Sequence, residues 1–280
     1  STNNTLRGAT VISNFRNIWI NGPNADGNGV ISNLIDGFGY SFSGVEILNG
    51  DRNAVSRNII RGHSSQGIEV NGTGSSNWIV GNIIRSNNND GIILNTAVEN
   101  HVISNTIDGK TYQNIGIWIT GGVRNILTNN LIVGNTLYGV YLNGSAGTNR
   151  IHGNTIRSNA VAGVLLNGAA VDANRIIENT IRGPGQTNGI KILDGNRNII
   201  SNNPVIAGHE QNGVVLTNLA ASNKIVANSI FSNVFAGVWL TGSAVDANRV
   251  VSNAIFGPGQ TYGVQRKAYS FSWSEQPSRP

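Results

Sequence analysis

The 280-residue sequence contains no cysteine and no methionine. Without cysteine, a disulfide framework and a thiolate metal site are both excluded. Without either sulfur ligand, a soft-metal site would depend on four histidines that lie far apart in the chain, His63, His101, His152 and His209. We therefore expect no metal site and no cofactor. Position 1 is a serine, which suggests a mature or excised segment that is flanked by other domains in a larger protein.

Charged and aromatic residues are also scarce. Only 12 % of the residues are charged and 6 % are aromatic, and the net charge of +5 is spread along the chain. A dense basic stripe interleaved with aromatic residues is absent, so we expect no nucleic-acid partner. No run approaches the roughly 18 apolar residues of a membrane helix, so we expect no membrane insertion. The 36 glycines indicate a turn-rich all-β protein.

A repeated pattern of asparagine and β-branched residues dominates what is present. It reads Asn-x-Ile-x-x-Asn-x-Ile, followed by a glycine that opens a short Gly-Ile-x-Leu strand. The second asparagine returns every 23 to 25 residues, at Asn33, Asn58, Asn82, Asn105, Asn130, Asn154, Asn179, Asn203, Asn228 and Asn253. A period this regular predicts a solenoid, in which each repeat packs only on its neighbours.

The alternation within each Gly-Ile-x-Leu strand predicts which residues face the core. The residues flanking the middle position are nearly always Ile, Val or Leu, so they point inward and the middle residue points outward. The sequence thus predicts an all-β fold, a single-stranded right-handed parallel β-helix of about eleven coils. We expect an irregular N-terminal coil or cap over residues 1–16, the helix over 17–265, and a capping strand and tail over 266–280.

A longer duplication lies above the single coil. The segment Ala170-Val171-Asp172-Ala173-Asn174-Arg175 returns 74 residues later as Ala244-Val245-Asp246-Ala247-Asn248-Arg249. This shift corresponds to three coils, so the sequence predicts a three-coil super-repeat.

The repeat resembles the parallel β-helix repeat of the pectate-lyase-like superfamily, a pattern also found in NosD-like proteins and in bacterial surface and secreted proteins. That resemblance implies the fold over Asn17 to about Gln265, with stacked asparagines in structural roles. Lyases of the superfamily would imply clustered acidic Ca²⁺ ligands, and alginate epimerases an Asp-Pro-His motif; neither is found. The link between NosD and copper has little support in a chain that lacks Cys and Met. Fold alone does not set the function.

The predicted outward column holds the candidate site residues. Glu46 and Glu69 are neighbours at about one coil spacing, close to the carboxyl separation of retaining glycosidases. No third polar group is evident that would separate their pKa values, so they are weak catalytic candidates. The aromatic members are candidates for stacking on a sugar ring: Trp19, Trp118, Tyr141 and Trp239.

A second column, which follows the first asparagine of each repeat, is basic. It holds Arg150, Arg175, Lys224 and Arg249. Its simplest role is solvation and the prevention of sideways strand pairing, with binding of acidic polysaccharide as the alternative.

Two main hypotheses for function remain. The first is a non-enzymatic extracellular or cell-surface module, a rigid spacer or adhesive stalk that also binds carbohydrate; uniform short turns and the missing catalytic cluster favour it. The second is a carbohydrate-active enzyme, such as a polysaccharide lyase, glycoside hydrolase or tailspike-like depolymerase. A sequence built from idealised repeats would also explain the missing Met and Cys. In either main hypothesis the expected partner is a polysaccharide or cell-surface glycan.

Overall fold

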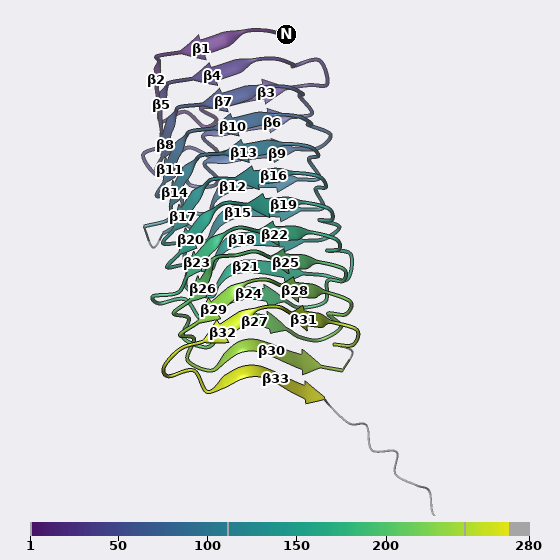
Figure 1. Cartoon of the computed structure of the whole chain (residues 1–280). Coiled ribbons are helices and arrows are strands. Elements are labelled where there is room, and N and C mark those ends of the chain that lie inside the picture. Colours follow the sequence, from purple (N-terminus) through teal and green to yellow (C-terminus); the bar gives the residue numbers. More distant parts are fainter. Residues whose placement is uncertain (1, 111, 244, 269–280) are drawn as a thin grey trace, which may run out of the picture.

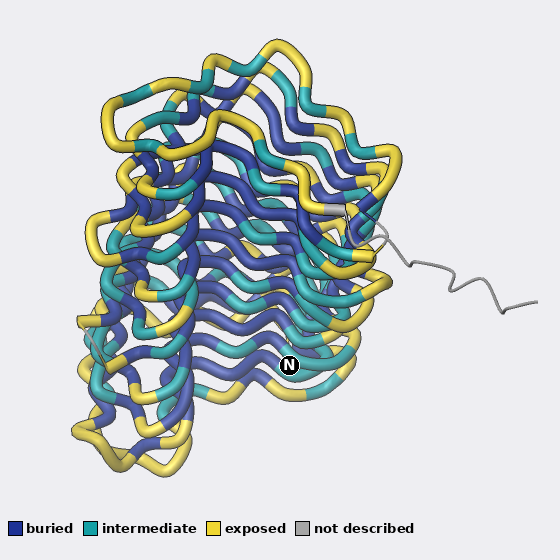
Figure 2. Tube along the Cα trace, turned by 90° about the horizontal axis from the view of Figure 1, so that it is seen from below, coloured by how far each residue is buried: buried dark blue, intermediate teal, exposed yellow. Residues whose placement is uncertain are grey.

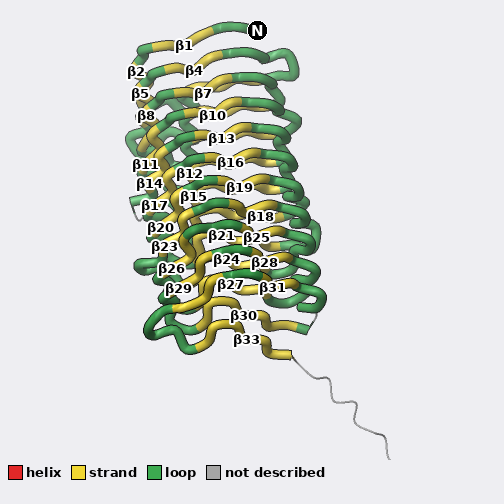
Figure 3. Tube along the Cα trace, viewed as in Figure 1, coloured by secondary structure: helices red, strands yellow, loops and turns green. Residues whose placement is uncertain are grey.

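The computed structural model describes residues 2–110, 112–243 and 245–268, and this part of the chain forms one solenoid without helices (Figures 1 and 3). Each coil contributes one short strand to each of three parallel sheets, and every sheet has eleven strands. The sequence prediction of a right-handed parallel β-helix of about eleven coils is confirmed.

The three sheets, called A, B and C, follow one another around each coil. Sheet A comprises β1 (Thr5–Arg7), β4 (Gly29–Ile31), β7 (Ala54–Ser56), β10 (Trp78–Val80), β13 (His101–Ile103), β16 (Ile126–Thr128), β19 (Arg150–His152), β22 (Arg175–Ile177), β25 (Ile199–Ser201), β28 (Lys224–Val226) and β31 (Arg249–Val251). Sheet B comprises β2 (Thr10–Ile12), β5 (Leu34–Asp36), β8 (Ile59–Arg61), β11 (Ile83–Arg85), β14 (Thr106–Asp108), β17 (Leu131–Val133), β20 (Thr155–Arg157), β23 (Thr180–Arg182), β26 (Val205–Ala207), β29 (Ser229–Phe231) and β32 (Ala254–Phe256). Sheet C comprises β3 (Ile18–Asn21), β6 (Val45–Leu48), β9 (Ile68–Asn71), β12 (Asp90–Asn95), β15 (Ile115–Thr120), β18 (Tyr138–Asn143), β21 (Ala162–Asn167), β24 (Asn188–Ile192), β27 (Asn212–Leu216), β30 (Ala236–Gly242) and β33 (Tyr262–Ala268).

The first coil begins earlier than the repeat pattern indicated. β1 and β2 lie within residues 1–16 and pair in register with β4 and β5. At the other end, β33 extends the last predicted strand to Ala268, and the remainder of the predicted capping strand lies outside the described residues.

The core is a continuous apolar column along the inside of the solenoid. Seen along the axis, buried residues line the interior and exposed residues lie at the outer corners (Figure 2). The residues that flank the middle position of sheet C, such as Ile92 and Leu94, are fully buried, as their alternation predicted. Because each coil buries its apolar side chains against the next, stability depends on stacking rather than on single strands.

Two asparagine ladders line the corners on either side of sheet A. Asn130 is typical: its backbone N–H and its Nδ2 both donate to Oδ1 of Asn154 in the next coil, each at 2.9 Å, and its Nδ2 also donates to the carbonyl of Val102 at 2.9 Å. The ladders provide hydrogen bonds for polar groups that tight turns would otherwise bury unpaired. The structural role expected of the asparagines is therefore confirmed.

The glycine that opens each sheet C strand is required by close packing. A Cβ at Gly139 would lie 2.6 Å from Cγ2 of Ile156 and 2.7 Å from the carbonyl oxygen of Gly163. Since ordinary contacts between such atoms are longer, a side chain cannot enter this corner without displacing the next coil.

Candidate functional site

The middle positions of sheet C form one continuous column, as predicted. Direct pairing in register joins Trp19, Glu46, Glu69, Ile93, Trp118, Tyr141, Leu165, Lys191, Val215, Trp239 and Gln265 in order. The expectation that all of them face solvent is wrong. Glu46, Ile93, Leu165 and Val215 are buried, because neighbouring side chains in the ladder lie about 4.8 Å apart and cover one another.

Glu46 lies in the N-terminal part of the column and is paired with an arginine. Glu46 is buried, with 8 % of its side chain exposed, and Nη1 of Arg16 lies 3.3 Å from its Oε2. Burial raises the pKa of Glu46, while the Arg16 guanidinium lowers it and the Glu69 carboxylate raises it further. The same guanidinium lies 4.6 Å over the Trp19 ring, so one face of that exposed ring is already covered.

Glu69 is the half-buried member of the acidic group and is held by two hydrogen bonds. Oγ of Ser43 donates to its Oε2 at 3.1 Å, and Nδ2 of Asn71 donates to its Oε1 at 2.7 Å. These bonds fix the carboxylate in one orientation on the outer face of sheet C.

Asp90 is a third carboxyl group that sequence reasoning missed. It is 1 % exposed, and neither carboxyl oxygen makes a hydrogen bond of ordinary geometry. Burial raises the pKa of Asp90 to about 7, against a lowering by the Ile115 backbone N–H and with a further rise from Glu69. The missing third polar group beside the glutamates therefore exists.

Its position explains why it was missed. Asp90 immediately precedes the strand glycine, a position to which simple alternation gives no outward role. Asp90 nonetheless lies on the same side as Glu69, whose charge acts on it. Ser43, which occupies the same position in an earlier coil, likewise bonds to Glu69. A lone acidic residue at a position filled elsewhere by Ser, Gln, Ile, Tyr, Ala or Asn was the available signal.

Trp118 and Tyr141 stack on each other. Their ring centroids lie 5.8 Å apart with the planes inclined by 23°, and Tyr138 lies 5.2 Å from Tyr141. Nε1 of Trp118 donates to Oδ1 of Asn143 at 3.0 Å. Because the ring faces are turned toward each other along the column, they offer less free flat surface than the sequence predicted.

Trp239 lies between two hollows near the C-terminal end of sheet C. One hollow, of about 390 Å³, is lined by Glu210, Gln211, Val234 and Phe235. The other, of about 720 Å³, has a more polar wall that includes Thr217, Asn218, Thr241, Ser243 and Lys267. The edge of Phe235 packs on Trp239 with centroids 5.3 Å apart. An aromatic platform beside polar groups is typical of small-molecule recognition.

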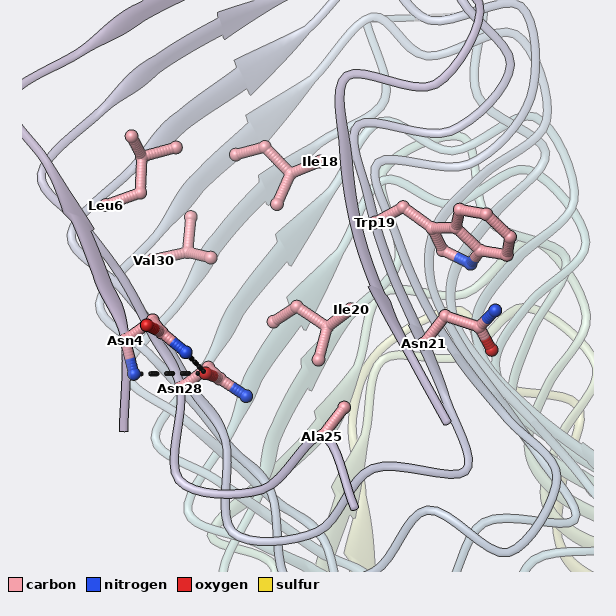
Figure 4. Close-up of a pocket in the computed structure, with 10 residues that line it drawn as sticks. Asn4, Leu6, Ile18, Trp19, Ile20, Asn21, Ala25, Asn28 and Val30 are labelled. Carbon is pink, nitrogen blue, oxygen red and sulfur yellow. Dashed lines mark hydrogen bonds between the residues drawn. The ribbon is translucent and has the colours of Figure 1, made fainter. Parts of the chain in front are cut away.

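A cavity of about 320 Å³ at the N-terminal end belongs to the core (Figure 4). Leu6, Ile18, Ile20 and Val30 point into it, whereas Trp19 lies on the other side of its strand (Figure 4). These side chains correspond to residues that are fully buried in the middle coils. The cavity is thus the uncovered interior of the first coil.

The four histidines have separate structural surroundings. His63 and His209 are buried in a third ladder at the corner before sheet C, where Nδ1 of His63 lies 2.9 Å from Oδ1 of Asn87 and Nδ1 of His209 lies 2.6 Å from Oδ1 of Asn233. The other two lie on sheet A: His101 stacks on Trp78 at 4.2 Å, and His152 lies 3.8 Å from Glu178. Within residues 2–110, 112–243 and 245–268, no group of three or more His, Asp or Glu side chains is placed to hold a metal ion.

Two family models match the chain. One, described as right handed beta helix region, matches residues 17–181, and the other, described as periplasmic copper-binding protein (NosD), matches residues 137–279. The chain belongs to the right-handed β-helix families that these two models describe. No curated protein matches the sequence. No helix in the described part of the chain is long and apolar enough to span a membrane.

Solved structures with the same fold include carbohydrate-active enzymes. The mannuronan C-5 epimerase AlgE4 A-module of Azotobacter vinelandii is similar with a TM-score of 0.76 and 16 % identity, over 95 % of this chain and 81 % of that one. The periplasmic alginate epimerase AlgG has a TM-score of 0.60 and 14 % identity, over 86 % and 74 % of the two chains. DFA-IIIase of Arthrobacter chlorophenolicus A6 has a TM-score of 0.58 and 18 % identity, over 71 % and 53 %. At these identities the likeness shows the fold alone.

Proposed function

We propose that this protein is a rigid β-helix module that binds a carbohydrate chain on the outer face of sheet C. The observation that carries the proposal is Trp239, whose ring lies between two hollows. A sugar ring presents apolar C–H groups that pack on an aromatic face and hydroxyl groups that need hydrogen-bond partners. Thr217, Asn218 and Thr241 supply such partners in one hollow.

The remaining aromatic residues of sheet C extend this surface along the solenoid. Trp19 is 49 % exposed, and Trp118 and Tyr141 are half-buried in the same column. A polymer that runs along the solenoid axis would meet each of them in turn. The similar folds of enzymes named for alginate support carbohydrate as the ligand class. The NosD family's description as periplasmic supports a location outside the cytoplasm, secreted or periplasmic.

Binding can be measured by isothermal titration with a panel of neutral and acidic oligosaccharides. Trp239→Ala is expected to weaken binding about five- to 150-fold, because stacking on an aromatic ring contributes about 1–3 kcal/mol and each 1.4 kcal/mol is tenfold. Trp78→Ala is the matched control, since Trp78 is 45 % exposed but lies on sheet A. Trp239→Phe keeps an aromatic platform and distinguishes lost stacking from misfolding. Equal affinity of Trp239→Ala and the unmodified protein would refute the assignment.

A second candidate function is glycoside hydrolysis at Glu46 and Glu69. The observation that favours it is Asp90, a carboxyl group with a pKa of about 7 beside Glu69. A buried carboxyl group that keeps its proton up to neutral pH can serve as an acid in glycoside hydrolysis. In such a reaction, protonated Glu69 would donate its proton to the glycosidic oxygen and regain one from the buried Asp90, while Glu46 would act as the second carboxylate, attacking the sugar carbon before water releases the product.

Mass spectrometry of products from a polysaccharide panel tests this second candidate. Products that disappear in the Glu46→Gln, Glu69→Gln double variant, but persist in Glu178→Gln, an exposed carboxylate beside sheet A, would support catalysis at the acidic group. An absence of products with the unmodified protein, or products that persist in the double variant, would contradict it and leave binding alone.

A further inference from the structure

We propose that the outer surface of sheets A and B in the C-terminal half of the solenoid binds a linear anionic polysaccharide. The surface, called the basic face, consists of Arg150, Arg157, Arg175, Arg182, Lys224 and Arg249. All six side chains are exposed, and none forms an ion pair with a carboxylate in the described part of the chain. The proposal concerns other sheets than the carbohydrate face and does not rest on it.

The cations of the basic face lie directly above one another in neighbouring coils. Arg150 pairs in register with Arg175 on sheet A, and Arg157 with Arg182 on sheet B. The backbones of such partners are about 4.8 Å apart. Like charges that face each other directly across strands destabilise a sheet. The fold therefore gains nothing from this arrangement unless an anion compensates it.

Elsewhere in the same solenoid, five arginines are paired with a carboxylate of the preceding coil. Arg52 lies 3.0 Å from Asp26, Arg61 lies 2.7 Å from Asp36, and Arg124 lies 2.8 Å from Glu99. Arg197 and Arg266 have equivalent partners in Asp172 and Asp246. Pairing an arginine with a carboxylate one coil away is thus readily available to this fold. The basic face lacks it at six positions.

The three-coil duplication repeats the cation pair. Arg150 and Arg175 correspond, 74 residues later, to Lys224 and Arg249, which again pair in register. Three coils separate the two pairs, a distance of about 14 Å along the axis at about 4.8 Å per coil. A ligand that meets both pairs must be extended and carry negative charge at intervals, which is the chemistry of a linear polyanion.

The side chains that lie between the cations of the basic face favour a polysaccharide over a nucleic acid as the ligand. Sheet A has no aromatic side chain at its strand positions from Arg150 to Val251 apart from the imidazole of His152. Phe231 and Phe256 on sheet B stack on each other, with centroids 5.2 Å apart and planes inclined by 8°. Single-stranded nucleic acids need free aromatic platforms for their bases. Arginine instead binds carboxylate or sulfate groups through paired N–H donors, which uronic or sulfated sugars supply.

Affinity for polygalacturonate, measured across a range of NaCl concentrations, tests the proposal. The Arg150→Gln, Arg175→Gln variant is expected to bind about tenfold more weakly with a shallower salt dependence, because two charge contacts are lost. The matched control is Arg52→Gln, Arg124→Gln, which removes the same net charge from paired residues and is expected to bind within about twofold of the unmodified protein. The first variant should also melt at the same or a higher temperature, since it relieves repulsion between stacked charges.

Three results would overturn the proposal. The unmodified protein would not bind polygalacturonate, or both variants would weaken binding equally, which would indicate attraction by net charge alone. Alternatively, a single-stranded oligonucleotide would bind as tightly and depend on Arg150 and Arg175 in the same way, which would assign the surface to nucleic acid. Trp239 lies on sheet C, so the effect of Trp239→Ala on the binding of neutral sugars is independent of all three results.

Discussion

The substitution Asp90→Asn is expected to stabilise the protein at neutral pH. Burial raises the pKa of Asp90 from 3.8 to about 7 in the folded protein. The folded state therefore holds this proton more tightly than the unfolded state does. Asp90 therefore does not reduce the free energy of unfolding below about pH 4. The free energy of unfolding falls as the pH rises from about 4 to about 7, and it is lowest above about pH 7.

The size of the effect follows from the shift. Each pKa unit corresponds to about 1.4 kcal/mol, so the ionised carboxylate costs the fold about 4 kcal/mol above pH 7. An asparagine carries no charge and is nearly isosteric, so most of this cost should disappear. Because neither Asp90 oxygen has a hydrogen bond of ordinary geometry, few native interactions are lost.

Urea unfolding at about pH 4, 6 and 8 measures the prediction. Asp90→Asn should raise the urea midpoint at pH 8, have little effect at pH 4, and flatten the pH dependence in between. Glu210→Gln, an exposed carboxylate, is the control and should change neither the midpoint nor its pH dependence. A variant that is less stable than the unmodified protein at pH 8 would refute the reasoning.

Three further predictions concern the ladders and corners. Burial lowers the pKa of His209 from 6.5 to about 4, so the free energy of unfolding should fall by about 3 kcal/mol as the pH drops from about 6.5 to 4. In thermal melts, the melting temperature of His209→Gln should depend less on pH over this range. A pH dependence equal to that of the unmodified protein would contradict the assignment. Asn130→Ala removes four ladder hydrogen bonds and should lower the free energy of unfolding by about 4 kcal/mol, as measured by urea unfolding. Asn253→Ala, in the last coil, should lower it less. Equal losses in the two variants would argue against a cooperative ladder. Gly139→Ala should destabilise the protein by about 1–3 kcal/mol. At Gly263 the nearest atom to an added Cβ is 4.0 Å away, so Gly263→Ala should change the melting temperature little. An unchanged melting temperature in Gly139→Ala would mean that the corner can relax.

The candidate site was only partly predictable from the sequence. The column from Trp19 to Gln265 could be placed because register follows from the period alone. Asp90 could not, because simple alternation places the residue before the strand glycine on the core side, whereas in the structure it lies beside Glu69. The mutual stacking of Trp118 and Tyr141 also depends on rotamers that alternation does not specify.

The sequence by itself determined the solenoid, its core and its asparagine ladders. In a repeat protein each coil contacts only its neighbours, so one regular spacing of Asn, Gly and β-branched residues fixes nearly every backbone pairing. Outside the two asparagine ladders, the tertiary structure alone decided which polar side chains meet between coils. It placed His63 and His209 in a third ladder, brought Asp90 beside Glu69, and left the arginines of the basic face without carboxylate partners. These outcomes depend on side-chain contacts between residues more than twenty positions apart, which no local pattern encodes.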